Sequence, residues 1–138
     1  MKVKRIDHIG IVVNDLNAAL ATYERNFDLT ADASRGGDVP VFAIKNAFVP
    51  IGGTDLEFFQ PTSDDGPVAK FVKERGEGLY MMSIEVDDLA GAIAHLRGLG
   101  TRVGDPINGL AFVSMRATHG VNPQLVQRGL GYFPKPVY

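Results

Sequence analysis

Along the opening of the chain, from Ile6 to Val13, the residues His8, Gly10 and Val12 alternate with the apolar Ile9, Ile11 and Val13. Successive side chains of a strand point to opposite faces, so this alternation predicts a strand. Asp15 follows, and we expect its carboxylate to cap a helix by accepting from the free N–H groups of the first turn. Apolar residues then recur at helical spacing at Leu16, Ala19, Leu20, Tyr23 and Phe27.

Further strands complete the pattern predicted for the first half. Apolar residues from Val41 to Ile51 indicate a buried strand, and 52–55 reads as a hairpin turn into a strand at 56–59. The first half therefore has the predicted order βαβββ. Pro61 to Pro67 then interrupts regular structure, and a short amphipathic helix is expected to begin at Pro67 and to end near Gly76.

The second half repeats this pattern. His8 corresponds to Met81 and Asp15 to Asp88, a constant offset of 73 positions. After the repeated strand and helix, short strands are predicted near 101–103, 110–117 and 124–128. We expect a single domain, 1–138, with internal modules at approximately 1–62 and 78–130. Its fold is predicted to be α+β, with two βαβββ modules forming an incomplete barrel around a central cavity and with helices outside.

Composition excludes several classes of function. The net charge of -2 argues against broad nucleic-acid binding, which needs a basic surface. The chain has no cysteine, so disulfides, thiolate metal sites and a cysteine nucleophile are ruled out. No apolar run approaches the ~20 residues of a membrane span, and the N-terminus lacks the apolar core of a signal peptide. We therefore expect a cytoplasmic protein.

Four segments make the chain similar to the vicinal oxygen chelate superfamily of glyoxalases, bleomycin-resistance proteins and extradiol dioxygenases. They are Ile6 to Leu16, Asp55 to Pro61, Pro67 to Leu79 and Ile84 to Leu89. Within the superfamily the chain most resembles the methylmalonyl-CoA epimerases. The resemblance implies the glyoxalase-like fold and a homodimer, but one scaffold of this kind hosts many reactions. The tail from Gly131 to Tyr138 is expected to pack on the surface or on a partner subunit.

The resemblance also implies positions for the ligands of a divalent metal: His8, Glu57, Met81 and Gln124. Met81 stands where the epimerases have histidine, and Gln124 where they have glutamate. Hard and borderline cations bind imidazole and carboxylate in preference to thioether. We therefore expect no cofactor, or a weakly bound Mg, Mn, Co, Ni or Zn ion at a three-ligand site of His8, Glu57 and Gln124. The epimerases' proton-transfer segment maps onto 41–43, which has no titratable group, and this argues against methylmalonyl-CoA epimerisation itself.

His8 and Glu57 could also work without a metal, although a lone histidine on a strand is commonly a hydrogen-bonded packing residue. A carboxylate can hold an imidazole in one tautomer, so the pair could abstract a proton next to a carbonyl while Gln124 donates to the developing oxyanion. We expect Met81, Phe42, Phe59 and Phe112 to contact the apolar or aromatic part of a small substrate. The sequence thus predicts a glyoxalase- or epimerase-type lyase or isomerase. The alternative is a non-catalytic protein that sequesters a hydrophobic small molecule.

Overall fold

The computed structural model describes residues 1–131, and most of the tail that was expected to pack on the surface or on a partner lies outside them. The chain divides into two compact units. The N-terminal unit is His8–Tyr80. The C-terminal unit is Met1–Asp7 together with the residues from Met81 onward. Strand β1 (Val3–Val12) therefore begins in one unit and ends in the other.

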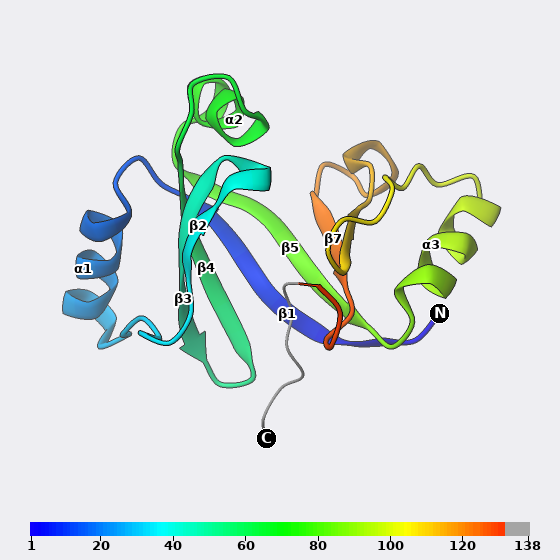
Figure 1. The fold of residues 1–138 in the computed structure, drawn as a ribbon, viewed down its shortest axis with the longest axis horizontal. Helices are drawn as coiled ribbons and strands as arrows, with labels where there is room; N and C mark the ends of the chain where they lie inside the picture. The colour runs from blue at the N-terminus through cyan, green and yellow to red at the C-terminus, as the bar shows by residue number, and fades with distance from the viewer. Residues whose placement is uncertain (132–138) are drawn as a thin grey trace. The chain divides into compact units, whose positions relative to one another are not determined.

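The N-terminal unit has the predicted order βαβββ, followed by a helix (Figure 1). After β1 come α1 (Leu16–Phe27), β2 (Gly37–Val39), the 3-10 turn η1 (Pro40–Phe42), β3 (Ile44–Ile51), β4 (Thr54–Pro61) and α2 (Pro67–Arg75). Its strands lie in the order β2-β3-β4-β1. The β3–β4 hairpin is antiparallel, and β1 runs parallel to β4.

Strand register decides which side chains face α1. Ala47, Val49 and Phe58 are buried in a cluster with Leu16, and Leu20 and Tyr23 of α1 pack against it. Glu57 pairs with Gly10 on one side and with Phe48 on the other. Because faces alternate along a strand, the row that contains His8 and Glu57 lies on the face of the sheet opposite α1.

The C-terminal unit repeats the plan with shorter strands. It contains most of β5 (Gly78–Val86), then α3 (Leu89–Gly98), β6 (Leu110–Phe112), the 3-10 turn η2 (Met115–Ala117) and β7 (Pro123–Val126). The strand order is β5-β7-β6, with β5 parallel to β7. Helix α3 covers one face, where Val86, Ile93 and Leu125 form the buried core.

Both long helices begin with the same pair of hydrogen-bonding side chains. Asp15 accepts from Ala18 N, and Asp88 accepts from Gly91 N, each at 3.0 Å, which confirms both predicted caps. The sequence patterns gave no indication of the second partner. A glutamine at the end of a strand accepts from the first N–H of each helix: Gln60 from Leu16 at 2.9 Å and Gln127 from Leu89 at 2.8 Å.

Several predicted strands were too long. Val41 and Phe42 belong to η1, because Pro40 opens a tight turn that ends at Ala43 in the left-handed region. In the second half Val103 forms only an isolated bridge, and η2 interrupts the strand expected over 110–117. Apolar composition alone does not distinguish a short strand from a tight turn. Within the described residues, no helix is long and apolar enough to span a membrane.

Candidate functional site

A buried polar cluster lies on the face of the N-terminal unit opposite α1. His8 is 2% exposed, Glu57 8% and Asn46 9%. Asn46 Nδ2 donates to Glu57 Oε2 at 2.8 Å, and Glu57 Oε1 lies 3.7 Å from His8 Nε2. The second distance is longer than a hydrogen bond, so at these two atoms the imidazole and the carboxylate are close neighbours rather than a hydrogen-bonded pair.

Three neighbouring strands bring this cluster together. His8 comes from β1, Glu57 from the middle of β4 and Asn46 from β3. A carboxylate buried among apolar strands is stable only with polar partners. The sequence prediction paired His8 with Glu57 but missed Asn46. The available signal was a polar residue on the same parity as Ile44 and Phe48, which are apolar.

Phe48 and Arg35 border the cluster. The Phe48 ring meets the His8 imidazole edge to face, with 6.3 Å between ring centroids. Arg35 Cζ lies 4.9 Å from the centroid of the same phenyl ring. The Arg35 guanidinium also makes a bidentate pair with Asp55, at 2.7 and 2.8 Å, and a third bond to Asp32 at 2.8 Å.

These contacts shift the titration of the charged partners. Hydrogen bonds from the Ser34 hydroxyl and N–H, with further help from Arg35, lower the pKa of Asp32 from 3.8 to about 2. The hydrogen bonds to Asp55 raise the pKa of Arg35 above its usual value. Asp32 and Arg35 are therefore both charged at neutral pH.

An aromatic row begins at Phe59, one of the residues expected to contact substrate. Phe59 is buried and meets Tyr80 edge to face at 5.3 Å, and Tyr80 meets Phe71 of α2 at 4.8 Å. Burial raises the pKa of the Tyr80 hydroxyl. Phe42, another predicted substrate contact, is half-buried in η1.

In the C-terminal unit, Gln124 forms a second buried polar pair. The Ser83 hydroxyl donates to Gln124 Oε1 at 2.9 Å, and both side chains are almost fully buried. The register pairs Gln124 with Ser83 and with Phe112, and Met81 shares the parity of Ser83. All four therefore lie on the face opposite α3. In this orientation the Gln124 amide presents its NH₂ group as a donor.

An ionic cluster in the C-terminal unit was not predicted. Asp7 is fully buried and accepts two hydrogen bonds from Arg128, each at 2.7 Å. Arg5 donates to Asp7 and, at 2.7 Å, to the buried Glu85. The sequence offered no periodicity that distinguishes these buried charges from exposed ones. Because these buried charges are paired with one another, we do not assign any of them the role of a catalytic base.

The chemistry of the donor groups tests whether the implied divalent metal fits. His8 and Glu57 are ligands of the required kind, but Met81 offers a thioether, and Gln124 Oε1 already accepts from Ser83. Over residues 1–131, no three His, Cys, Asp or Glu side chains are grouped as a metal would need. The donors do not fit a tightly held divalent metal. Weak binding at His8, Glu57 and Gln124 stays a prediction.

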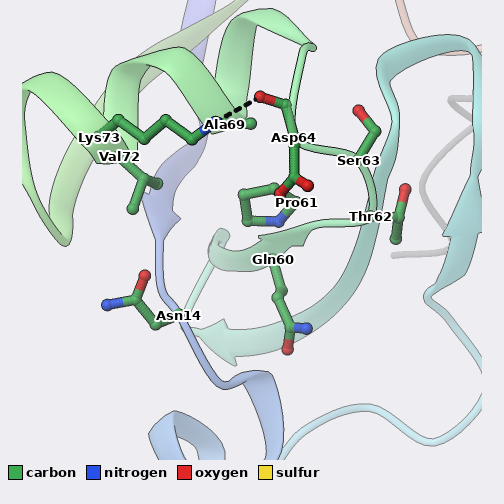
Figure 2. Close-up of a pocket in the computed structure, with 9 residues that line it drawn as sticks. All are labelled: Asn14, Gln60, Pro61, Thr62, Ser63, Asp64, Ala69, Val72 and Lys73. Carbon is green, nitrogen blue, oxygen red and sulfur yellow. Dashed lines mark hydrogen bonds between the residues drawn. The ribbon is translucent and has the colours of Figure 1, made fainter.

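A separate surface pocket of about 400 Å³ lies in the N-terminal unit, between the end of β4 and α2 (Figure 2). Lys73 of α2 reaches across to donate to the backbone oxygen of Asp64 at 2.7 Å. Gln60 is one of the lining residues, and it is also the residue that caps α1. None of the predicted site residues lines this pocket.

Known proteins resemble the chain in sequence. Over 94 residues it is 33% identical to the human mitochondrial methylmalonyl-CoA epimerase, which covers 67% of this chain. The match spans only about half of that relative's own length, 52%. Over 102 residues it is 31% identical to the ethylmalonyl-CoA/methylmalonyl-CoA epimerase of Cereibacter sphaeroides, covering 73% of this chain and 75% of the relative.

The fold agrees with these sequence matches. A Streptomyces coelicolor methylmalonyl-CoA epimerase, solved in complex with 2-nitronate-propionyl-CoA, superposes with a TM-score of 0.87 at 26% identity, covering 93% of this chain and 99% of that one. The structure therefore has the predicted glyoxalase-like α+β fold. The family model described as Glyoxalase/Bleomycin resistance protein/Dioxygenase superfamily matches residues 7–114. Since this match covers most of the sequence, the chain belongs to that superfamily.

Proposed function

We propose that the protein is an isomerase-type enzyme that moves a proton at the carbon next to a carbonyl group. The proposed substrate is a small acyl thioester with an apolar part, and the reaction does not depend on a tightly held metal. The similar epimerases support this reaction class, since their names describe acyl-CoA epimerisation. The solved relative binds a nitronate analogue of an acyl-CoA, which also supports a thioester as the ligand.

The observation that carries the proposal is the buried arrangement of His8, Glu57 and Asn46. The Glu57 carboxylate faces His8 Nε2, which favours the tautomer with its proton on that nitrogen and leaves Nδ1 with a lone pair. Asn46 holds the other carboxylate oxygen and so fixes the direction from which Glu57 acts on the imidazole. In this arrangement His8 is the proposed general base and Glu57 its orienting partner.

The proposed step begins when His8 Nδ1 takes the proton from the carbon next to the carbonyl. The electrons of the broken C–H bond move into the carbonyl group and form an enolate, and the proton converts the imidazole to imidazolium. The nearby Glu57 carboxylate stabilises the positive charge. Return of the proton to the same face of the carbon only exchanges it with solvent. Protonation of the enolate by water on the opposite face inverts the carbon and completes an epimerisation, and loss of a group from the next carbon would complete an elimination.

Several finer predictions belong to this proposal. We propose that Gln124 donates to an oxyanion, and that Met81, Phe42, Phe59 and Phe112 contact the apolar part of a ligand. Methylmalonyl-CoA itself is a disfavoured substrate, because positions 41–43 lack the titratable group that the resemblance implies there. A homodimer and a cytoplasmic location stay predictions.

Deuterium exchange tests the reaction. The protein is incubated in deuterated water with propionyl-CoA and, separately, with methylmalonyl-CoA, and incorporation at the carbon next to the thioester is followed by mass spectrometry. We expect catalysed exchange that is lost in His8→Ala and strongly reduced in Glu57→Ala. His95→Ala is the matched control, because His95 is an exposed histidine on α3. Full turnover in both His8→Ala and Glu57→Ala would rule out the proposed pair.

A binding measurement, combined with the exchange assay, separates a catalytic protein from one that only sequesters its ligand. Titration with 2-nitronate-propionyl-CoA, followed by calorimetry, reports binding independently of exchange. Tight binding without exchange of any thioester would favour a non-catalytic binding protein and would contradict the enzyme proposal.

A further inference from the structure

The loop 32–36 is held by several contacts against the face of the sheet that carries His8 and Glu57. Arg35 makes three charge-assisted hydrogen bonds, two to Asp55 of β4 and one to Asp32 of the loop itself. Bidentate pairs of this kind are geometrically specific as well as strong. Asp55 is also the residue of β4 that pairs with His8 of β1. Arg35 is therefore anchored on the strand position directly beside His8.

Backbone contacts fix the same loop onto β3. Asp32 N donates to Phe48 O at 2.8 Å. Gly36 has a φ of +97°, and a Cβ there would lie 2.6 Å from Asn46 O, so only glycine allows this close approach. The loop thus packs on the two residues of β3 whose side chains serve the polar cluster. Asn46 holds Glu57, and Phe48 meets His8.

Phe48 connects the loop to the imidazole. Its ring contacts the Arg35 guanidinium at 4.9 Å and the His8 ring at 6.3 Å. A guanidinium over an aromatic ring is attracted by the ring quadrupole. Arg35 itself cannot move without breaking its bonds to Asp55 and Asp32. The Phe48 ring that contacts His8 is therefore the same ring on which the anchored Arg35 guanidinium packs.

We propose that Arg35 is a positioning residue for His8. It acts through Phe48 and Asp55 and keeps the imidazole turned toward Glu57. Arg35 is not placed on the substrate, because each of its three guanidinium nitrogens already donates to a carboxylate. The expected effect on turnover rests on the proposed function, whereas the effect on the His8 ring does not.

The test measures both effects in Arg35→Met, Arg35→Lys and the nearly isosteric Asp55→Asn. Imidazole proton signals are recorded by NMR. The chain has three histidines, so His8→Ala identifies the His8 signals. Phe48→Leu shows how these signals move when the neighbouring ring is removed. Arg97→Met is the matched control, because Arg97 also bonds a carboxylate, that of Asp105 in the C-terminal unit.

We expect Arg35→Met and Asp55→Asn to move the His8 signals in the same direction as Phe48→Leu, and Arg35→Lys to move them less. Arg97→Met should leave them unchanged. In the exchange assay, kcat should fall on the order of tenfold to a hundredfold with little change in KM, as expected for a misplaced base.

Folded Arg35→Met or Asp55→Asn protein with unchanged His8 signals would overturn the inference. If Arg35→Met does not fold, Asp55→Asn makes the same test. Absence of exchange in the unsubstituted protein would refute the proposed function but would leave the NMR comparison decisive for the role of Arg35. Loss of kcat without movement of the His8 signals would also refute positioning through Phe48.

Discussion

Replacing Asn46 by leucine should destabilise the protein through the carboxylate that it leaves behind. Leucine has a similar size but cannot donate to Glu57, which is only 8% exposed and loses a 2.8 Å hydrogen bond. Hydrogen bonds to charged groups contribute about 1.5–3 kcal/mol, and removing one partner imposes the desolvation cost of the other. We therefore expect Asn46→Leu to lower the free energy of unfolding by about 2 kcal/mol. Replacing both partners by leucine should cost less than the sum of the two single changes.

A double-mutant cycle in urea measures this coupling. The four proteins are the unsubstituted chain, Asn46→Leu, Glu57→Leu and the double variant, and the expected coupling is about 2 kcal/mol. Ser83 and Gln124 provide the matched neutral pair, buried and bonded at 2.9 Å, for which Ser83→Ala and Gln124→Leu should couple by only about 1 kcal/mol. Additive effects of Asn46→Leu and Glu57→Leu within about 0.5 kcal/mol would refute the reasoning.

Other predictions concern the caps, the core, acid and metal. Asp15→Ala and Asp88→Ala should each lower the free energy of unfolding by about 1 kcal/mol, whereas the corresponding asparagine variants should keep most of that stability. Equal losses for the alanine and asparagine variants in urea denaturation would contradict capping. Phe58→Ala, in a fully buried position, should cost about 3–5 kcal/mol by the same assay, and a loss below about 1 kcal/mol would contradict the core assignment. The pKa of Asp32 is lowered to about 2, so its stabilisation is present above pH ~4 and is lost as the pH falls toward 2. In Asp32→Asn, the free energy of unfolding should change less between about pH 4 and pH 2 than in the unsubstituted protein. If the two proteins lose stability in parallel over this range, Asp32 does not carry the effect. Elemental analysis of protein purified without chelator should find substoichiometric divalent metal, whereas a full equivalent would contradict the donor analysis.

Much of the fold could be predicted because it depends on local patterns. The repeat at a constant offset, the two aspartate caps and the helical apolar spacing each fix an element from nearby residues alone. One failure was local and another was long-range. Val41 and Phe42 have strand composition, but Pro40 commits them to a tight turn. Gln60 and Gln127 escaped notice because each caps a helix more than 35 positions away along the chain.

The candidate site could be predicted only in part. His8 and Glu57 were chosen from strand parity and resemblance, and the structure places them 3.7 Å apart. Asn46 and Arg35 were not chosen. The parity of Asn46 marks the face on which it lies but not its partner, and Arg35 lies in a loop without any periodicity. Their roles follow from strand pairing and from the path of the loop 32–36.

By itself, the sequence determined the succession of strands and helices, their duplication, and the kinds of donor group available. It did so because alternation, helical spacing and capping act over a few residues. The tertiary structure alone decided which polar and charged side chains meet their partners. It brought Asn46 to Glu57, Arg35 to Phe48, and Asp7 to Arg128 across 121 positions of chain. Charges in a sheet must find partners on neighbouring strands, and strand pairing is a property of the whole fold.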